Sequence, residues 1–500
     1  MVREMPRLVL LLILVTTVSI GYADPPLTIK AQAVWNGLTK AGTTTEIAIS
    51  LLADRNGEVE VSLPDHEPRL RVTAVLNALQ PYTLWLTVRP TAGRVLRVDA
   101  QMQGGDASTG TAVRFEDAPE DANLVASTMI LPADRVTSDA HPIPVLLNPA
   151  VSMLPHTSGG YGSITAVILD SHELARLDER QMESLQDYSA ACGHIVLVGN
   201  ATPRSEALIG TAGCGGRYIA RVTGRESALM TAQGMQNGIA PALPSANRLQ
   251  PMQNTDVLVA TRAALVVFFI LYATGMLLFA RESRRVAPLL GVPVLAALLS
   301  WMAWSNDKVG RSLISWSEID THGHMLRYSA LLKITGNGKG DARTLLPAGF
   351  GLFWPQTKNS TAELVRYDSD AEPAVLRSRG YLLSQDAFFT RGTMRFEPPV
   401  TISMTDQGPV IENRSSEVSP PALLGWNDQH NPVPALRPGE RWSPPEHGTP
   451  WNVVNIEEQL LRERAQAGMA ALLVPHRLLP ADKDALLRID ERGWLLIVSS

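Results

Sequence analysis

Two long apolar runs in the middle of the chain restrict its fold more than any other sequence feature. Residues 263–280 and 286–305 contain no charged side chain. As helices rising about 1.5 Å per residue, each run would extend roughly 27–30 Å, which matches the hydrocarbon core of a bilayer. The alternative is a pair of buried helices in a soluble core, but soluble folds seldom contain charge-free runs of this length. We therefore predict a two-helix transmembrane hairpin within residues 258–305.

The connection between the two runs sets the direction of the predicted hairpin. It contains three arginines within a short stretch, and the positive-inside rule places such a basic connection in the cytoplasm. We assign this topogenic role to Arg281, Arg284 and Arg285. The segments that flank the hairpin are then both predicted to lie outside the cytoplasm.

The N-terminal residues 1–23 have the pattern of a secretory signal peptide. Arg3 and Arg7 flank a short n-region, the apolar run Leu8–Val15 follows it, and small residues precede a cleavage site after Ala23. The run is short for a spanning helix, so we predict cleavage, with an uncleaved anchor as the alternative. The predicted localisation is therefore the bacterial inner membrane, with both large domains in the periplasm.

The charge balance restricts the class of partner. The chain has 44 Lys and Arg against 49 Asp and Glu, which gives a net charge of −5. A nucleic-acid-binding protein normally carries a basic face and a high isoelectric point. We therefore exclude nucleic acid and expect the lipid bilayer and envelope or inner-membrane proteins as partners. Two cysteines are too few for a disulfide framework or a Cys-rich zinc module, and we predict no cofactor.

Residues 24–135 are predicted to form a β-sandwich. Short stretches rich in β-branched residues recur along this region, separated by Gly, Pro, Asn and Asp. The pair Asn56-Gly57 between two of them is a strong hairpin signal. The predicted strands are Leu27–Val34, Thr45–Leu51, Val59–Leu63, Leu70–Val75, Tyr82–Val88 and Val95–Met102.

Residues 136–250 change to an α/β pattern. Ile143–Leu147, Ile164–Leu169 and Ile195–Val198 are continuous apolar runs, as expected of strands that are covered on both faces. Between the last two runs we predict a helix whose apolar stripe is formed by Leu174, Leu177, Leu185 and Tyr188. A strand, a helix and a strand in this order predict a parallel sheet.

The segment Ser163–Asn200, SITAVILDSHELARLDERQMESLQDYSAACGHIVLVGN, resembles a known type of domain. It is similar to the flavodoxin-like, class I glutamine-amidotransferase-like domain of uncharacterised bacterial inner-membrane proteins. Those proteins also resemble this chain in layout, with a signal, a β-sandwich, this domain and transmembrane helices. The resemblance is one of pattern and rests on no specific motif. It implies a noncatalytic role, because the catalytic Cys–His arrangement is not recovered here.

Cys192 and Cys214 are the two cysteines of the chain. An active amidotransferase-like domain needs a nucleophilic Cys on a tight strand-to-helix turn, with a His and a carboxylate nearby. Cys192 lies at the end of a predicted helix, and the residues after Cys214 look like a strand. We predict instead a disulfide between the two, because an oxidising compartment favours pairing within one extracytoplasmic domain. Two buried free thiols are the alternative.

Residues 306–500 are predicted to form a mostly-β domain with Pro- and Gly-rich connections. His322 and His324 would share one face of a strand and could bind a metal, but no spacing identifies a third ligand, so exposed turn histidines are favoured. Gly336–Gly340 is interpreted as a hairpin turn, because it lacks the ending of a phosphate loop. Core packing is preferred over a carbohydrate-stacking surface for three tryptophans, Trp426, Trp442 and Trp451.

Together these features predict a multidomain chain. Its parts are an N-terminal β-sandwich, an α/β flavodoxin-like domain, a two-helix transmembrane hairpin and a C-terminal mostly-β domain. The predicted function is that of a membrane-anchored periplasmic binding or scaffold protein that is noncatalytic and belongs to an inner-membrane complex. The alternative is a divergent envelope hydrolase that uses Cys214 or a metal held by His322 and His324.

Overall fold

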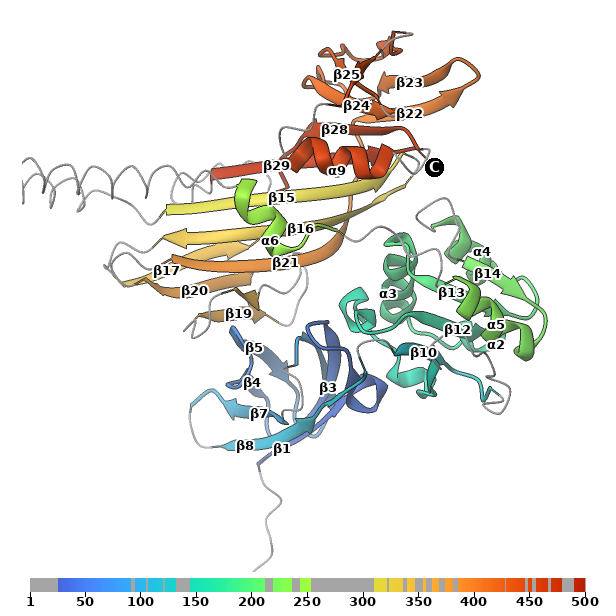
Figure 1. Ribbon diagram of the computed structural model, residues 1–500. Coiled ribbons are helices and arrows are strands. Elements are labelled where there is room, and N and C mark those ends of the chain that lie inside the picture. Colours follow the sequence, from blue (N-terminus) through green and yellow to red (C-terminus); the bar gives the residue numbers. More distant parts are fainter. Residues whose placement is uncertain are drawn as a thin grey trace, which may run out of the picture.

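The computed structural model shows a chain that is mostly β, with 51% of the described residues in strands and 18% in helices. Figure 1 shows a β-sandwich, a smaller unit that contains helices beside it, and a long curved sheet. The structure describes residues 26–252 and 310–499, without 91–94, 105–106, 120–121, 132–143, 212–218, 236–242, 322, 336–339, 347–353, 357–361, 368–373, 381–384, 428, 446–447, 452–455, 466–468 and 479–489.

The N-terminal part is a β-sandwich of two antiparallel layers. The first layer consists of β1 (Leu27–Ala33), β3 (Thr45–Ala53) and β6 (Tyr82–Val88). The second includes β4 (Gly57–Leu63), β5 (Arg69–Leu76), β7 (Val95–Met102) and β8 (Ser108–Arg114). Val59, Val61 and Leu63 of β4 are wholly buried, because alternate residues of a strand face the core. The 3-10 helix η1 (Val34–Gly37) and a short pair, β2 (Leu38–Thr39) and β9 (Glu116–Asp117), complete this part.

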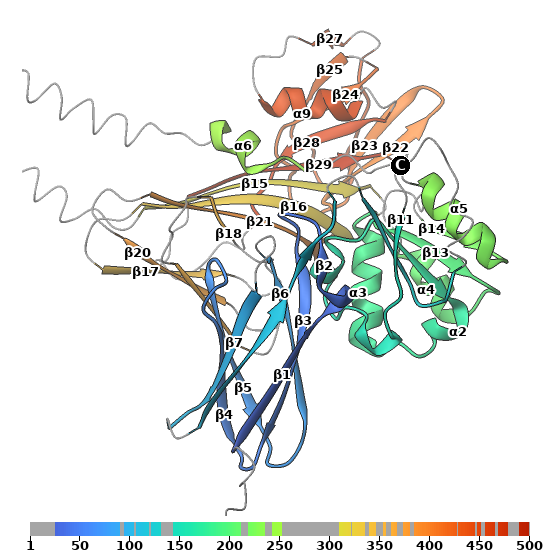
Figure 2. The same ribbon diagram turned by 60° about the horizontal axis from the view of Figure 1, so that its bottom comes forward.

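The second layer of the sandwich continues into strands from the C-terminal half of the chain. β5 pairs antiparallel with β4 and parallel with β19 (Glu363–Tyr367). β20 (Ala374–Gly380) and β17 (Gly340–Leu346), which Figure 2 shows from another side, extend the sheet. The sheet has the order β17-β20-β19-β5-β4-β7-β8 (Figure 1). Arg71 crosses this junction and binds Glu363 at 2.8 Å. The regions predicted as separate domains at 24–135 and 306–500 thus share one seven-stranded sheet.

A nine-stranded sheet forms the centre of the C-terminal part. β15 (Gly310–Asp320), β16 (Met325–Thr335) and β21 (Gln385–Arg395) pair antiparallel, and β29 (Asp490–Val498) pairs parallel with β15. The helices α6 (Ala246–Leu249) and α9 (Ile456–Ala465) cover one face, where their leucines pack with Trp316 and Phe389. The remaining strands are β18 (Trp354–Pro355), β28 (Ala471–Pro475), β24 (Ala422–Trp426), β25 (Gln429–Val433) and β27 (Thr449–Pro450).

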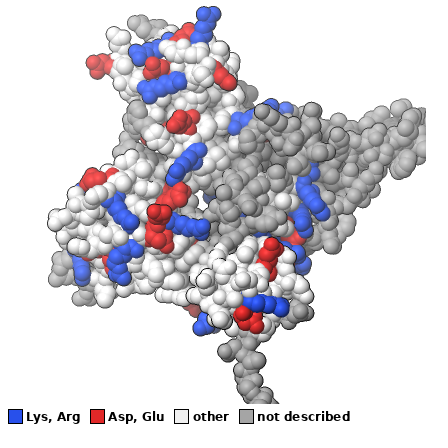
Figure 3. Space-filling model, turned by 180° about the vertical axis from the view of Figure 1, so that it is seen from behind, with Lys and Arg blue, Asp and Glu red and all other residues white. Residues whose placement is uncertain are grey.

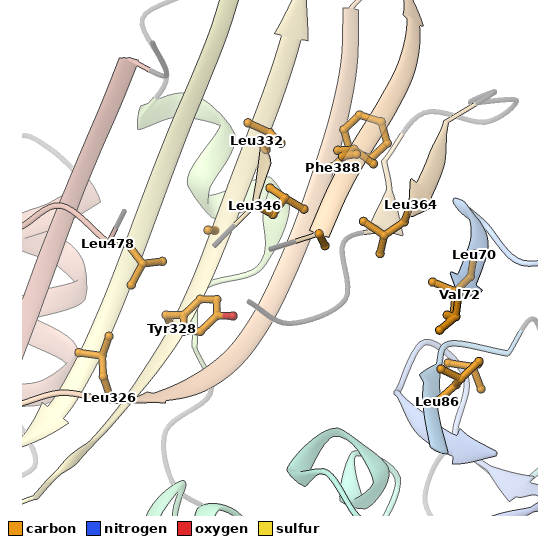
Figure 4. Close-up of a cluster of buried hydrophobic side chains, with 14 of the residues drawn as sticks. Leu70, Val72, Leu86, Leu326, Tyr328, Leu332, Leu346, Leu364, Phe388 and Leu478 are labelled. Carbon is orange, nitrogen blue, oxygen red and sulfur yellow. The ribbon is translucent and has the colours of Figure 1, made fainter. Parts of the chain in front are cut away.

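One hydrophobic core links the sandwich with the nine-stranded sheet. Tyr328 and Phe388 are wholly buried on the sheet face opposite to α9, and they belong to the same cluster as Leu70 and Leu364 (Figure 4). Apolar burial of this kind contributes about 25 cal/mol per Å² of surface removed from water. A small sheet of β22 (Val400–Thr405), β23 (Gly408–Asn413) and β26 (Arg441–Trp442) adds Val400, Ile402 and Ile411 to the same core.

A parallel five-stranded sheet and its helices form a third part, which we name the parallel unit (residues 123–235). Its sheet has the order β11-β10-β12-β13-β14. The strands are β10 (Asn123–Ser127), β11 (Pro144–Leu147), β12 (Ala166–Asp170), β13 (His194–Val198) and β14 (Ile219–Val222). The helices are α2 (Ser171–Leu174), α3 (Glu179–Ala190), α4 (Pro203–Gly210) and α5 (Arg225–Met235), with 3-10 helices η3 (Val151–Met153), η4 (Ser158–Tyr161) and, beyond the unit, η7 (Gln250–Met252).

The fold class that we expected from the sequence is wrong. The part of the chain that the structure describes is mostly β and contains no flavodoxin-like α/β domain. The connection between β11 and β12 consists of the 3-10 helices η3 and η4, where an α/β crossover of this type would carry an α-helix. The segment that contains η3 and η4 packs on the sandwich. The parallel unit is therefore docked on the β-sandwich and does not form a separate domain of the expected type.

The expected transmembrane hairpin is not supported either. None of the helices in the described part of the chain is both long and apolar enough to cross a membrane. The hairpin segment 258–305 and its three topogenic arginines, Arg281, Arg284 and Arg285, lie outside the described residues.

Candidate functional site

The loop 156–163 joins the parallel unit to the sandwich. The wholly buried carboxylate of Glu46, in β3, accepts the backbone N–H of His156 at 2.7 Å and the hydroxyl of Thr157 at 2.9 Å. A buried carboxylate is tolerated only where hydrogen bonds replace its water. Glu46 therefore fixes the start of the loop. Burial of Tyr161 raises the pKa of its hydroxyl, and the negative charge of Glu46 raises that pKa further.

The rest of this loop follows the sandwich surface closely. The indole N–H of Trp35 donates to the carbonyl of Gly160 at 2.8 Å, and the hydroxyl of Thr44 donates to the carbonyl of Gly159 at 2.8 Å. At Gly162 an added Cβ would collide with Thr44, so the close approach requires glycine there. The backbone of the loop is thus held from two sides of η4.

A polar pocket of about 370 Å³ lies beside this loop, between β6, η3 and the start of α3. The His156 ring stacks on Trp85 with 4.0 Å between ring centroids, and its Nε2 lies 3.0 Å from a carboxylate oxygen of Asp178. The other oxygen of Asp178 accepts the N–H of Gln181 in the N-terminal capping box of α3. Burial lowers the pKa of His156 more than Asp178 raises it. These polar groups bind one another, which orients the pocket wall.

The parallel unit also contacts the nine-stranded sheet. Arg395 of β21 binds Glu183 of α3 at 2.8 Å, and the hydroxyls of Thr393 and Ser158 lie 3.3 Å apart. Burial, together with the charge of Glu183, raises the pKa of Asp187 to about 6, and Arg395 opposes this shift. Contacts from α3 and the 156–163 loop therefore hold the parallel unit against the sandwich and against the nine-stranded sheet.

A second hollow, of about 780 Å³, lies on the outer face of β4, β7 and β8, and we name it the sheet hollow. Its floor consists of short side chains, including Ser62, Gly110 and Ala112, while the Arg97–Asp99 pair stands at its wall with 2.7 Å between the charged atoms. Short side chains leave the backbone of the sheet accessible, and the polar wall supplies hydrogen-bonding groups. This arrangement suits a polar, extended ligand.

Of the two cysteines that are predicted to form a disulfide, the structure describes Cys192. Cys192 is buried just after α3, with a positive φ of 66°, and is disulfide-bonded. Cys214 lies outside the described residues. The pairing of the two therefore stays a prediction, although the chain contains no third cysteine.

We expect neither cysteine to react with an alkylating reagent in the native protein. After reduction and unfolding, two thiols per chain should react, because each disulfide yields two thiolates. Mass spectrometry of a non-reducing digest should recover the Cys192 peptide linked to the Cys214 peptide. Rapid native alkylation of Cys214 would instead favour a nucleophile at that position.

The predicted metal and loop sites are only partly described. His324 lines a pocket of about 500 Å³ together with Glu397 and Arg414, and His322 lies outside the described residues. Among the residues that are described, no three His, Cys, Asp or Glu side chains are grouped as metal ligands. Of the predicted hairpin turn Gly336–Gly340, residues 336–339 lie outside the described residues, and Gly340 begins β17.

The three tryptophans considered as a carbohydrate surface pack into two different clusters. Trp426 and Trp442 lie against the core that links the sandwich and the long sheet, and Trp451 lies against the cluster under α9. Core packing accounts for all three. Sequence reasoning missed Glu46, although a charged residue at an inward position of an apolar strand was a usable signal.

Comparisons with known proteins do not identify a family. The sequence matches no protein-family model and no curated protein. Similar solved structures include the CARDB domain of a Pyrococcus furiosus protein in complex with di-metal ions, at 13% identity and a TM-score of 0.15 over 19% of this chain and 96% of that one. The yeast δ-COP μ-homology domain complexed with a Dsl1 peptide matches at 8% identity and a TM-score of 0.20, over 38% and 95% of the chains.

A Paenibacillus cycloisomaltooligosaccharide glucanotransferase is similar at 12% identity and a TM-score of 0.17, over 34% of this chain and 27% of that one. Scores this low carry no argument about function.

Proposed function

We propose that the chain is a noncatalytic binding and scaffold protein of the bacterial cell envelope that acts outside the cytoplasm. The observation that supports this most is the pairing of β19 with β5, which joins strands from both halves of the chain in one sheet. A shared sheet fixes the outward faces of both halves relative to each other. A scaffold needs such fixed faces in order to hold partners in a defined arrangement.

The compartment is supported by two independent features. The pattern of residues 1–23 is that of an export signal. The bonded state of Cys192 suits an oxidising compartment, since disulfides are rare in reducing cytosol. The charge distribution suits a protein partner, because basic and acidic side chains are interspersed among the described residues of the face in Figure 3.

We propose the sheet hollow as the surface that binds the partner. Its short floor residues and its charged wall fit an extended polar segment of another protein, which would lie across β7 and β8. Specificity would come from the Arg97–Asp99 pair and from Glu60, which line the same hollow.

Site-specific photo-crosslinking in the native host tests this proposal. A crosslinking residue in place of Gln101, which is exposed in the hollow, should form a defined adduct with a partner. The same residue in place of Lys30, exposed on the other layer, is the control and should not form it. Ala112→Trp should fill the hollow and reduce the Gln101 adduct at least fivefold without loss of folded protein. Equal adducts at both positions, or an adduct indifferent to Ala112→Trp, would contradict the proposal.

A further inference from the structure

Two arginines from different parts of the chain lie on neighbouring aromatic rings. Arg89 follows β6 of the sandwich, and its guanidinium lies 4.6 Å from the centroid of the Trp354 ring in β18. Arg391, in β21, lies 5.2 Å from the centroid of Phe389. The Trp354 and Phe389 rings contact each other edge to face at 5.1 Å. One aromatic pair thus connects the positions of the two cations.

Most donors of both guanidinium groups have no protein acceptor in the described part of the chain. Each guanidinium carries five N–H donors. The Nε of Arg89 donates to the carbonyl of Gly42 at 3.1 Å, and an Nη of Arg391 donates to the carbonyl of Leu243 at 3.1 Å. No ion pair joins either group to a carboxylate among the described residues, whereas Arg395 on the same strand pairs with Glu183.

Three of the segments that neighbour the pair also lack acidic residues. None occurs between Glu67 and Asp99, the stretch that contains Arg89. The stretches that contain Trp354 and Leu243 are equally free of acid, from Asp341 to Glu363 and from Glu226 to Asp256. The segments that contain Arg89, Trp354 and Leu243 therefore supply no counter-ion, and the carboxylate of Asp386, on the strand of Arg391, accepts from the hydroxyl of Ser378.

The positive charge of Arg391 acts against the positive charge of Arg89. Burial lowers the pKa of Arg89, and the charge of Arg391 lowers that pKa further; burial also lowers the pKa of Arg391. Arginine stays protonated in proteins, so the pair cannot relieve the repulsion by losing a proton. A bound anion would relieve it and would satisfy the remaining donors.

We propose that Arg89 and Arg391 form a binding site for a phosphate group at the junction of the sandwich and the nine-stranded sheet. Two fixed guanidinium forks match the several oxygens and the double charge of a phosphate better than the single charge of a carboxylate. The site lies apart from the sheet hollow, and it does not depend on the proposed scaffold function. The phosphate group belongs either to a soluble phosphate compound or to a lipid headgroup.

Calorimetric titration of the purified full chain with inorganic phosphate tests the site, at constant ionic strength set with chloride. Arg89→Gln and Arg391→Gln are each expected to weaken binding at least tenfold. Arg395→Gln is the matched control, because Arg395 lies on the same strand but has a carboxylate partner, and it should change the affinity less than twofold. Absence of binding to the unaltered chain, or equal affinity in all variants, would overturn the proposal.

Lysine variants keep the test valid if the glutamine variants do not fold. Arg89→Lys and Arg391→Lys retain the charge but lose the bidentate fork, so phosphate affinity should still fall severalfold. If both lysine variants fold and bind phosphate as tightly as the unaltered chain, the proposed phosphate site is wrong.

Cosedimentation with phosphatidylglycerol vesicles, and with phosphatidylcholine vesicles as control, distinguishes the two sources of the phosphate group. Arginine-dependent vesicle binding supports a headgroup, and phosphate binding without vesicle binding supports a soluble compound.

Discussion

Replacing Glu318 with alanine is expected to lower the free energy of unfolding by about 3–5 kcal/mol, because it would remove the carboxylate that binds a buried arginine. Glu318 lies in β15, and its Oε1 accepts from Arg464 of α9 at 2.7 Å and from the Trp316 indole at 3.1 Å. Its Oε2 accepts from Arg327 of β16 at 2.9 Å. The side chains of Glu318 and Arg464 are only 3% and 9% exposed.

Urea unfolding followed by circular dichroism measures this effect. Glu463→Ala is the matched control, because Glu463 lies on α9 beside Arg464 but forms an exposed ion pair with Arg248. This substitution should lower the free energy of unfolding by less than about 1 kcal/mol. Replacing both Glu318 and Arg464 with apolar residues should recover part of the loss, because the more deeply buried of the two arginine charges is then removed as well. A loss below about 1 kcal/mol for Glu318→Ala would show that water reaches this network.

Glu46→Ala is expected to loosen the parallel unit from the sandwich at a cost of about 2–4 kcal/mol, since each buried donor left without an acceptor costs about 1–3 kcal/mol. The backbone N–H of His156 and the hydroxyl of Thr157 would lose their shared acceptor. The loop 156–163 should then become sensitive to limited proteolysis, while the β parts stay resistant.

The control for this variant is Glu58→Ala, since Glu58 is exposed on β4 and its loss should leave the cleavage pattern unchanged. Mass spectrometry of the fragments locates the cuts. Resistance of the loop in folded Glu46→Ala would mean that the contacts of Trp35 and Thr44 suffice to hold it.

Local elements could be predicted from the sequence because their signals are local. The alternation of apolar residues predicted strands at Leu27–Val34 and Val59–Leu63, close to β1 and β4, and the apolar run Ile195–Val198 corresponds to β13. The helical stripe before Cys192 corresponds to α3, which begins at a capping box formed by Asp178 and Gln181.

Long-range pairings could not be predicted in this way. β19 and β5 are far apart in the sequence and run parallel, so no turn motif connects them. The flavodoxin-like interpretation failed because it extended one strand–helix–strand pattern to a whole domain, whereas η3 and η4 occupy the connection before β12. The arginine pair was missed because Arg89 and Arg391 meet only through the packing of β18 on β21.

Hydrogen exchange of the backbone amides of β5 tests the shared sheet, and with it the basis of the scaffold proposal, most directly. β5 is hydrogen-bonded to β4 on one side and to β19 on the other, so its amides should be protected as strongly as those of β4. If β5 is instead the edge of a separate sandwich, the amides that face away from β4 will exchange quickly while those of β4 stay protected, and the two halves of the chain do not share a sheet.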